Sequence, residues 1–586
     1  LEVSTEQIDE VVVSEERLRN KLESKQVSLE RLPLSTIKQI PALVGETDIL
    51  KSLQLLPGIQ SGSEGLSSLY VRGGGADQNL ILLDGVPVYN PFHLFGFLSF
   101  FNPEAINDIS IIKGGFPAWF GGRVSSVVDI TMKDGNTNSY HSNVNLGLIS
   151  SKIMVEGPLK KDKSSFLLTA RRSMVDVFLK PFIGKKTPEY FFYDATLKLN
   201  YSFSSRNRIF LTMFLGEDKI GDKTLFEEIT LNDKNYYETS NQKYGWGNIA
   251  SSLRWNYILS NRLIFNTQVN LSRYRYNDAY DYTFQGTAKD SVNKQTYSFQ
   301  HFSGIREIEI NHQASYYSSK HLLKAGISIN SQRIDPDFNG YLSKTMVGIT
   351  TQDTIIGDYE VKSKSYSVFI NDEISISDRF GLNVGLRHSG YFVQNSQYYS
   401  SEPRISVKYE ISSKLTIKSA YSLSSQYLQM LSTSNIFLPT DLWVPVTKNI
   451  KPVKSNQVVA AIVYKFFKDN LLISLEGYYK NYKNLIEYKE GASLLGYFHD
   501  LDERIEKGTG NSYGFEILIE KPEGATTGWI GYTLSWSNRQ FESINQGQPF
   551  PYKYDRRHNI TVVVQHRFNE HFDVNLNWIF GTGHAL

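Results

Sequence analysis

The chain has 586 residues, which is too long for one ordinary hydrophobic core, so we expect at least two structural units. Its net charge of +2, from 62 basic and 60 acidic residues, gives no electrostatic case for nucleic-acid binding. The sequence has 0 cysteines, which excludes disulfides, thiol catalysis and cysteine-based metal sites. No stretch approaches ~18 consecutive apolar residues, so we expect no transmembrane helix; a closed β-barrel could still cross a bilayer.

The first 136 residues mix helical and strand patterns. Ile49, Leu50 and Leu53 have the spacing of one helix face, and Pro57-Gly58 ends that pattern. Four short apolar runs are typical of strands, at Leu69–Val71, Leu80–Leu83, Ile109–Ile112 and Val127–Ile130. We therefore predict an α+β domain over residues 27–136. The tail before it, residues 1–26, is highly charged between Glu15 and Lys25.

A glycine-rich motif lies inside this domain, where LYVRGGGADQNLILLDGVPV runs from Leu69 to Val88. A nucleotide-binding loop would need its glycines between a strand and a helix. Here another predicted strand, Leu80–Leu83, follows Gly73, Gly74 and Gly75. We interpret these glycines as a tight hairpin turn with positive φ, and Asp84-Gly85 as the start of the next turn.

From residue 137 onward the sequence alternates apolar and polar residues in long segments. One apolar face consists of Phe572, Val574, Leu576, Trp578 and Phe580. Short polar turns separate pairs of segments, at Lys160–Lys163, Ser204–Asn207, Ser260–Arg262, Ser318–Lys320, Ser377–Arg379, Ser412–Lys414, Lys468–Asn470, Pro522–Thr527 and Asn569–His571. Longer polar and aromatic stretches lie between these turns, for example Lys219–Gln242 and Asp278–Asn293.

Short turns at one end and long loops at the other are typical of an antiparallel transmembrane barrel, with periplasmic turns and extracellular loops. The 13% aromatic content suits its interfacial girdles. The alternative is a soluble sandwich or propeller, which would not normally alternate loop length so regularly. We predict an all-β membrane barrel over residues 137–586 of this 586-residue chain, with about 18 strands present.

Two blocks of sequence resemble the TonB-dependent outer-membrane receptors: Leu69–Pro91, and Phe101–Gly135 with its ISIIKGG and FGGR elements. The PFHLFG and YDRRH stretches resemble the Bacteroidetes-type members. The resemblance implies a plug domain inside a barrel of about 22 strands, in the outer membrane of a Gram-negative bacterium. We therefore expect this chain to be incomplete at its C-terminus. We also expect it to lack a leader and an upstream carboxypeptidase-regulatory-like domain.

The resemblance also implies functional residues. The segment Ile8, Asp9, Glu10, Val11, Val12 and Val13 resembles a TonB box, which would pair with TonB, itself powered by ExbB–ExbD; the alternative is an ordinary edge strand or tail. Arg72 and Arg123 would join inward-facing barrel carboxylates in a plug–barrel charge cluster. Alternatively, Arg72 only covers the glycine turn or pairs locally.

Histidines are scattered, without a metal-ligand or catalytic pattern, so we expect no enzyme activity, no metal and no cofactor. Two functions stay open. The first is an energised importer that takes an extracellular nutrient past a movable plug. The second is a non-transporting plugged barrel that acts as a receptor or scaffold. Sugars, peptides and siderophores suit the loops equally, and a surface lipoprotein is a further expected partner.

Overall fold

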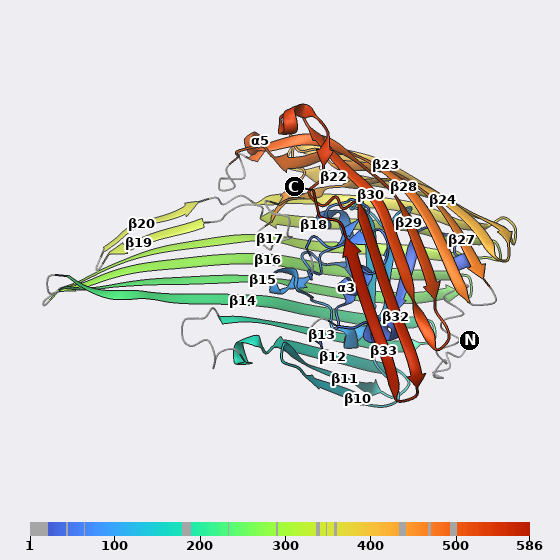
Figure 1. Cartoon of the computed structure of the whole chain (residues 1–586), viewed down its shortest axis with the longest axis horizontal. Helices are drawn as coiled ribbons and strands as arrows, with labels where there is room; N and C mark the ends of the chain where they lie inside the picture. Colours follow the sequence, from blue (N-terminus) through green and yellow to red (C-terminus); the bar gives the residue numbers. More distant parts are fainter. Residues whose placement is uncertain are drawn as a thin grey trace.

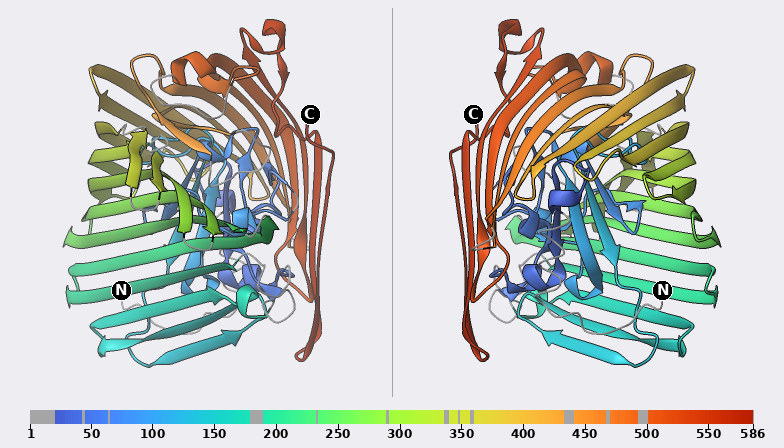
Figure 2. Two further views of the ribbon diagram at one scale, coloured as in Figure 1. Left: turned by 90° about the vertical axis from the view of Figure 1, so that its left-hand side faces the viewer. Right: turned by 90° about the vertical axis from the view of Figure 1, so that its right-hand side faces the viewer.

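The computed structural model describes residues 21–585, apart from residues 43–44, 64, 179–188, 232–233, 289–290, 336–339, 347–348, 357–359, 433–440, 467–469 and 493–500. One large, curved antiparallel sheet surrounds a small N-terminal domain, which Figure 2 shows inside the curve of the sheet. The predicted fold, a plug domain inside a sheet of barrel type, is confirmed. Among the described residues, no helix is long and apolar enough to cross a bilayer.

The plug domain is built on a five-stranded sheet with the order β1-β8-β9-β4-β5. The sheet is mixed, because β4 runs parallel to β9 while the other pairs are antiparallel. Its strands are β1 (Leu29–Pro33), β4 (Asn79–Leu83), β5 (Val86–Pro87), β8 (Ile106–Ile112) and β9 (Ser126–Met132). Two smaller pairs are β2 (Ile59–Gln60) with β3 (Tyr70–Val71), and β6 (Phe92–His93) with β7 (Leu98–Ser99).

Short helices complete the plug: α2 (Leu34–Gln39) and α3 (Ile49–Leu53). The predicted helix is thus confirmed in α3. Asp48 caps it by accepting a hydrogen bond from the Lys51 amide at 3.0 Å, and the buried side chains of Ile49, Leu50 and Leu53 join the plug core.

The large sheet contains 22 strands in nearly sequential order. They are β10 (His141–Leu146), β11 (Ser150–Lys160), β12 (Ser164–Ser173), β13 (Glu189–Ser204), β14 (Asn207–Leu231), β15 (Lys234–Ser260), β16 (Leu263–Ala288), β17 (Ser291–Tyr317), β18 (His321–Asp335), β19 (Gly340–Met346), β20 (Ile349–Ile356), β21 (Val361–Ser375), β22 (Phe380–Val393), β23 (Ser396–Ser412), β24 (Leu415–Gln426), β27 (Val453–Phe466), β28 (Leu471–Tyr488), β29 (Ile505–Lys521), β30 (Thr526–Phe541), β31 (Phe550–Pro551), β32 (His558–Asn569) and β33 (Phe572–Gly581). β25 (Leu428–Leu431), β26 (Leu442–Pro445) and α5 (Leu501–Arg504) lie in connections between these strands.

Each predicted short turn lies between two neighbouring antiparallel strands. The turn at Lys468–Asn470 is mostly outside the described residues, but β27 and β28 pair directly, with Phe466 opposite Leu471. The predicted strand number was lower than 22 because β10, β19, β20 and β31 were not anticipated. β10 and β33 stand at the two ends of the strand order, and no pairing joins them in the described part of the chain.

The predicted long loops need a correction. Lys219–Gln242 and Asp278–Asn293 are largely strand, because β14 to β17 continue through them as paired ribbons. These four strands have 25 to 27 residues each, against 15 in β18, and Figure 1 shows them projecting far beyond their neighbours. Above a membrane both faces of a ribbon meet water, so the apolar–polar alternation that reveals a strand is lost.

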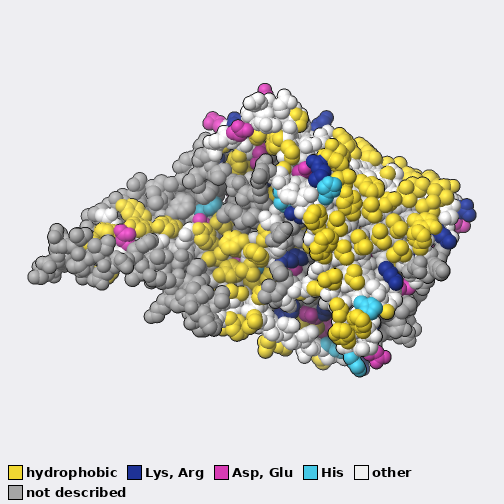
Figure 3. All heavy atoms as spheres, in the orientation of Figure 1, with side chains coloured by type: hydrophobic (Ala, Val, Ile, Leu, Met, Phe, Trp, Pro, Cys, Tyr) yellow, Lys and Arg dark blue, Asp and Glu magenta, His cyan; other side chains and the backbone are white. Residues whose placement is uncertain are grey.

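The two faces of the large sheet differ as expected for a membrane barrel. Apolar side chains such as Leu253, Ile308 and Ile370 are exposed on the outer face, while serine, asparagine and charged residues are buried on the inner face. Figure 3 shows the outer apolar surface as a broad continuous region. The outer face therefore suits lipid, and the inner face is filled by the plug.

Candidate functional site: the plug–barrel interface

Arg72 of the plug is fully buried against the inner face of the large sheet, which we call the wall. Its side chain donates to Glu516 from Nε at 2.7 Å and from Nη2 at 2.9 Å, a bidentate pair. The same Nη2 also donates to Glu476 at 2.5 Å. Its guanidinium lies 4.8 Å from the ring centroid of Tyr478. Arg72 therefore joins the plug to two neighbouring strands, β28 and β29.

Glu476 and Glu516 are directly opposite each other in the pairing of β28 with β29. Like charges in such pairs are destabilising, so the wall needs cations at this place. Arg72 supplies one, and Lys113 supplies the other by donating to Glu516 at 2.6 Å. Burial disfavours the charged guanidinium, but Glu516 and Glu476 outweigh burial and raise the pKa of Arg72 above its usual range. We call Arg72, Lys113, Glu476 and Glu516 the charge lock.

The chain just before β1 is attached to the same place. The Ser28 hydroxyl donates to Glu476 at 2.6 Å and accepts from Arg72 at 3.1 Å. Nearer the N-terminus, Lys21 donates to Glu520 on β29 at 2.6 Å. This leading segment is thus bonded to the wall before the plug sheet begins. Displacement of the segment would disturb the charge lock through Ser28.

The glycine motif allows close contact between the plug and the wall. Gly73 has a φ of +70°, and a Cβ there would lie 2.6 Å from Ser512 Oγ and 2.8 Å from Ser537 Cβ. Ser537 and Arg539 each donate to the Gly73 carbonyl at 3.1 Å. A side chain at this position would therefore push the plug away from β29 and β30.

Gly73, Gly74 and Gly75 do not close a hairpin, which corrects the expectation. β3 before them pairs with β2, whereas β4 after them pairs with β9 and β5, and a short 3₁₀ turn lies between. Asp84 and Gly85, with φ of 48° and 83°, do form the tight turn of the β4–β5 hairpin.

Arg123 lies apart from Arg72. Its guanidinium is 5.7 Å from the Tyr89 ring centroid and 5.8 Å from that of Trp443, and it forms no ion pair with any barrel carboxylate that the structure describes. Its charged neighbour is Asp77 of the plug. Burial raises the pKa of the Asp77 carboxyl to about 6, against the opposing effect of Arg123. The expected pair of arginines is therefore divided between two places.

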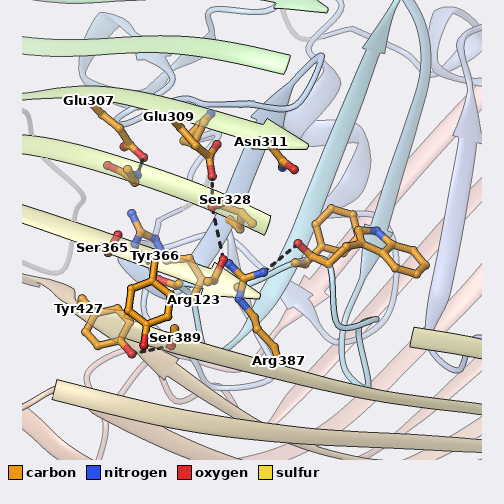
Figure 4. Close-up of a pocket in the computed structure, with 18 of the residues that line it drawn as sticks. Arg123, Glu307, Glu309, Asn311, Ser328, Ser365, Tyr366, Arg387, Ser389 and Tyr427 are labelled. Atoms are coloured by element: carbon orange, nitrogen blue, oxygen red, sulfur yellow. Dashed lines mark hydrogen bonds between the residues drawn. The ribbon is translucent and has the colours of Figure 1, made fainter. Parts of the chain in front are cut away.

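A cavity of about 220 Å³ lies beside Arg123, between the plug and β17, β18, β21 and β22. Figure 4 shows Glu307 and Glu309 entering it from β17, with Arg387 on the opposite side. Glu309 accepts from Ser328 at 2.9 Å, and Arg387 donates to the carbonyl of Trp119 at 3.3 Å. Charged and hydroxyl groups dominate its lining, so it suits water or a hydrophilic molecule.

The plug tip carries a buried histidine that connects two barrel strands. His93, in the PFHLFG stretch, lies 2.6 Å from Asp218 and 3.3 Å from Asp194. Its ring stacks on Phe192, with centroids 4.0 Å apart. Sequence reasoning missed this contact, although the resemblance had singled out the stretch.

Aromatic side chains surround the tip of the plug on the side of the long hairpins. Phe95 and Phe97 are 41% and 50% exposed, which is unusual for phenylalanines within a plug. Phe95 lies 4.9 Å from the ring of Trp246 on β15. The Tyr190 hydroxyl accepts a hydrogen bond from the Leu94 amide at 2.8 Å, and Tyr244 precedes Trp246 by two residues on β15. This end therefore offers flat apolar surfaces with hydroxyl groups at their edges.

The predicted segment Ile8–Val13 lies outside the described residues. The barrel carboxylates could not be named from the sequence. Glu476 was visible only as a residue on the polar face of its strand, and its contact with Arg72 spans 404 positions of the chain. Lys113 stands in the ISIIKGG element, but the resemblance assigned it no contact, and Glu516 carried no sequence signal that separated it from other charged residues.

The fold and the interface together define a plugged β-barrel of the outer membrane. The chain matches a family model for "TonB dependent receptor-like, beta-barrel" over residues 180–584, and the "TonB-dependent Receptor Plug Domain" over residues 27–128. The chain belongs to the TonB-dependent receptor family. The comparison with curated proteins gave no match.

Solved structures of receptors share the fold. The siderophore receptor PirA from Acinetobacter baumannii is 15% identical, with a TM-score of 0.63 over 95% of this chain and 86% of that one. The ferripyoverdine receptor of Pseudomonas aeruginosa is 12% identical, with a TM-score of 0.63 over 96% and 80%. The FrpB iron transporter from Neisseria meningitidis (F3-3 variant) is 14% identical, with a TM-score of 0.62 over 95% and 86%.

Family membership decides between the two functions left open. The protein is a TonB-dependent transporter of the Gram-negative outer membrane, which interacts with TonB and imports a small-molecule nutrient. The prediction that the protein is an importer is confirmed, and the alternative function as a scaffold is not favoured.

Proposed function

We propose that the segment Ile8–Val13 adds a strand to TonB and that tension on it opens the charge lock. Strand addition draws its affinity from main-chain hydrogen bonds, so the β-branched residues next to Asp9 and Glu10 suit it. One observation supports this most strongly: the chain between this segment and the plug sheet is bonded to the wall and reaches the charge lock at Ser28. ExbB–ExbD would supply the energy.

In the charge lock, Ser28 is the residue through which the proposed tension would act. Ser28 bonds to both Arg72 and Glu476, so its departure removes one hydrogen bond from each partner. Arg123 has a different role in this proposal: it holds Tyr89, Trp443 and Asp77 together beside the polar cavity. The division into a coupling tail (1–26), a plug (27–136) and a barrel (137–586) follows from the same proposal.

We call Phe95, Phe97 and Trp246 the aromatic tip. The substrate that suits the aromatic tip is a compact molecule with aromatic or sugar rings. Exposed Phe95 and Phe97, with Trp246 and two tyrosines nearby, provide stacking surfaces at the end of the long hairpins. Siderophores, for which the structural neighbour PirA from Acinetobacter baumannii is a receptor, fall within this class. A surface lipoprotein that docks on the projecting β14–β17 ribbon is a further part of the proposal.

The coupling segment is tested by Val12→Pro. Proline removes a main-chain donor and fixes φ, so strand pairing in the middle of Ile8–Val13 should fail. We expect uptake to be lost while folding and binding at the cell surface stay normal. The ligand is first identified by mass spectrometry of material that copurifies with the protein, and its uptake and cell-surface binding are then measured.

Val12→Ile is the matched control, because it keeps the main-chain hydrogen bonds and should be nearly silent. Wild-type uptake by the proline variant would show that Ile8–Val13 is not the coupling site. Failure of both variants to bind ligand would instead indicate a fault in folding. Copurification of a large protein assembly without a small molecule would revive the scaffold function.

A further inference from the structure

Four basic residues lie at one level across β16, β17, β18 and β21. In the strand pairing, Arg273 is opposite Arg306, Arg306 is opposite Arg333, and Arg333 is opposite Lys362. Opposite residues of antiparallel strands have their Cβ atoms about 4.5–5.5 Å apart, and like charges there are destabilising. We call these four residues the basic row. Three successive like-charged pairs are a cost that a bound anion would remove.

The basic row points away from the plug. Successive residues of a strand point to opposite faces of the sheet. Tyr274, next to Arg273, is buried and contacts Asn90 of the plug, while Ile305 and Ile334, next to Arg306 and Arg333, have 0% exposure. Arg306, Arg333 and Lys362 are themselves exposed.

The row also lies at the outer edge of the exposed apolar region on the outer face of the large sheet, which we call the apolar belt. On the same face, Leu271 and Ile308 directly follow the row toward the short turns on β16 and β17, and the exposed apolar residues continue with Val269 and Ile310. On β18 and β21, Ser331, Lys364 and Tyr366 come before the exposed apolar residues Ile327, Ile329, Val368 and Ile370. A tilted transmembrane strand crosses the hydrocarbon in about 9–11 residues. Since β16 begins at Leu263 after its short turn, Arg273 comes just at the end of such a span. The row therefore lies at the headgroup level of the outer leaflet.

Acidic partners do not neutralise the row. Glu360 pairs with Lys362 at 2.8 Å and with Arg333 at 3.8 Å. Glu360 also attracts Arg306 without forming an ion pair, and Arg273 forms no ion pair with any acidic residue in the described ranges. One carboxylate therefore faces four cations of the row. Arg275, one step further out, adds another positive charge, and its guanidinium lies 4.9 Å from the Phe302 ring centroid. The patch has an excess of positive charge next to an apolar surface.

We propose that the basic row binds the phosphate groups of an anionic lipid in the outer leaflet of the outer membrane. Guanidinium groups match phosphate oxygens in a bidentate manner, and basic residues at a membrane interface attract anionic headgroups. The apolar belt gives the acyl chains of the same lipid a surface on Ile308, directly beside the row, and on Ile329, which follows Ser331 on β18. That apolar surface is the reason to assign a lipid rather than a free anion.

The test uses the whole chain, purified in a neutral detergent, with diphosphoryl lipid A as the probe. The row variant is Arg273→Gln, Arg306→Gln and Arg333→Gln. The matched control, Arg206→Gln, Arg262→Gln and Arg379→Gln, removes the same charge from exposed short turns. We expect lipid A to raise the thermal midpoint of the wild type and the control, and to bind the row variant at least tenfold more weakly by native mass spectrometry.

A second readout separates lipid binding from damage to the fold. Without lipid, Arg306→Gln should be at least as stable as the wild type, because it removes two like-charged contacts; with lipid A, it should be the less stable protein. Three outcomes would overturn the proposal: equal binding of dephosphorylated lipid A, unchanged lipid A binding by the row variant, or an equal loss in the control. A thermal shift with inorganic phosphate as large as that with lipid A would also overturn the lipid assignment.

Discussion

The two opposed glutamates of the charge lock are neutralised by two cations of the plug, Arg72 and Lys113. Glu516→Gln removes one carboxylate and leaves Arg72 and Lys113 buried around Glu476 alone. Removal of one partner from a buried ion network costs about 3–5 kcal/mol. We expect hydrogen exchange in the plug to speed up correspondingly, measured by mass spectrometry in detergent.

Glu570→Gln is the control for this substitution, because it makes the same chemical change on an exposed short turn. It should leave the exchange of the plug unchanged. Wild-type protection in Glu516→Gln would mean that other contacts, such as those of Lys480 and Arg539 with plug carbonyls, hold the plug without the charge lock.

At the scale of single residues, the sequence could indicate Arg72 but not its partners. Arg72 stands next to three glycines in a stretch that resembles a known family. Its partners lie 404 and 444 positions away, on strands with many other inward-facing polar residues. Local patterns report which face a residue occupies, but the contact depends on the register of the whole sheet and on how the plug sits inside it.

At the scale of elements, the short turns were predictable because polar residues interrupt a strict alternation. The long hairpins were not predictable, because β14 to β17 extend beyond the membrane, where both faces of each strand meet water. The glycine turn was misread for a related reason: β3 and β4 are adjacent in the chain but belong to different sheets. Pairing partners are set by the tertiary fold rather than by the turn residues alone.

The outer face of β28 provides a test of strand depth in the membrane. Leu475 and Tyr479 both point outward, but Leu475 lies nearer the middle of the expected span. Leu475→Arg should cost about 2–4 kcal/mol, whereas Tyr479→Arg, near the interface, should cost about 0–1 kcal/mol. The free energies are measured by denaturant unfolding from lipid vesicles. Equal costs at the two positions would contradict the assigned depth.

At the scale of the whole molecule, three layers act together: lipid outside, a polar wall, and a plug bonded to that wall. The overall arrangement was predictable because alternation, turn spacing and the two plug motifs point to the same fold. The polar cavity beside Arg123 could not be predicted from the sequence, because its position depends on where the wall and the plug leave a space between them. Its charged lining suits water, so the interface offers a polar space where β17 and β22 face the plug.

Orientation in the membrane is the last property to test, and the absence of cysteine makes the test direct. Single cysteines are placed at Ser413, in a short turn, and at Gln548, in a connection at the opposite end of the strands; both positions are exposed. A membrane-impermeant maleimide applied to intact cells should label Gln548→Cys and spare Ser413→Cys, because the short turns face the periplasm. After lysis both should react, which controls for burial of the thiol. Labelling of Ser413→Cys alone on intact cells would show that the topology is the reverse of the one assigned. The aromatic tip and the basic row would then lie on the periplasmic side of the membrane.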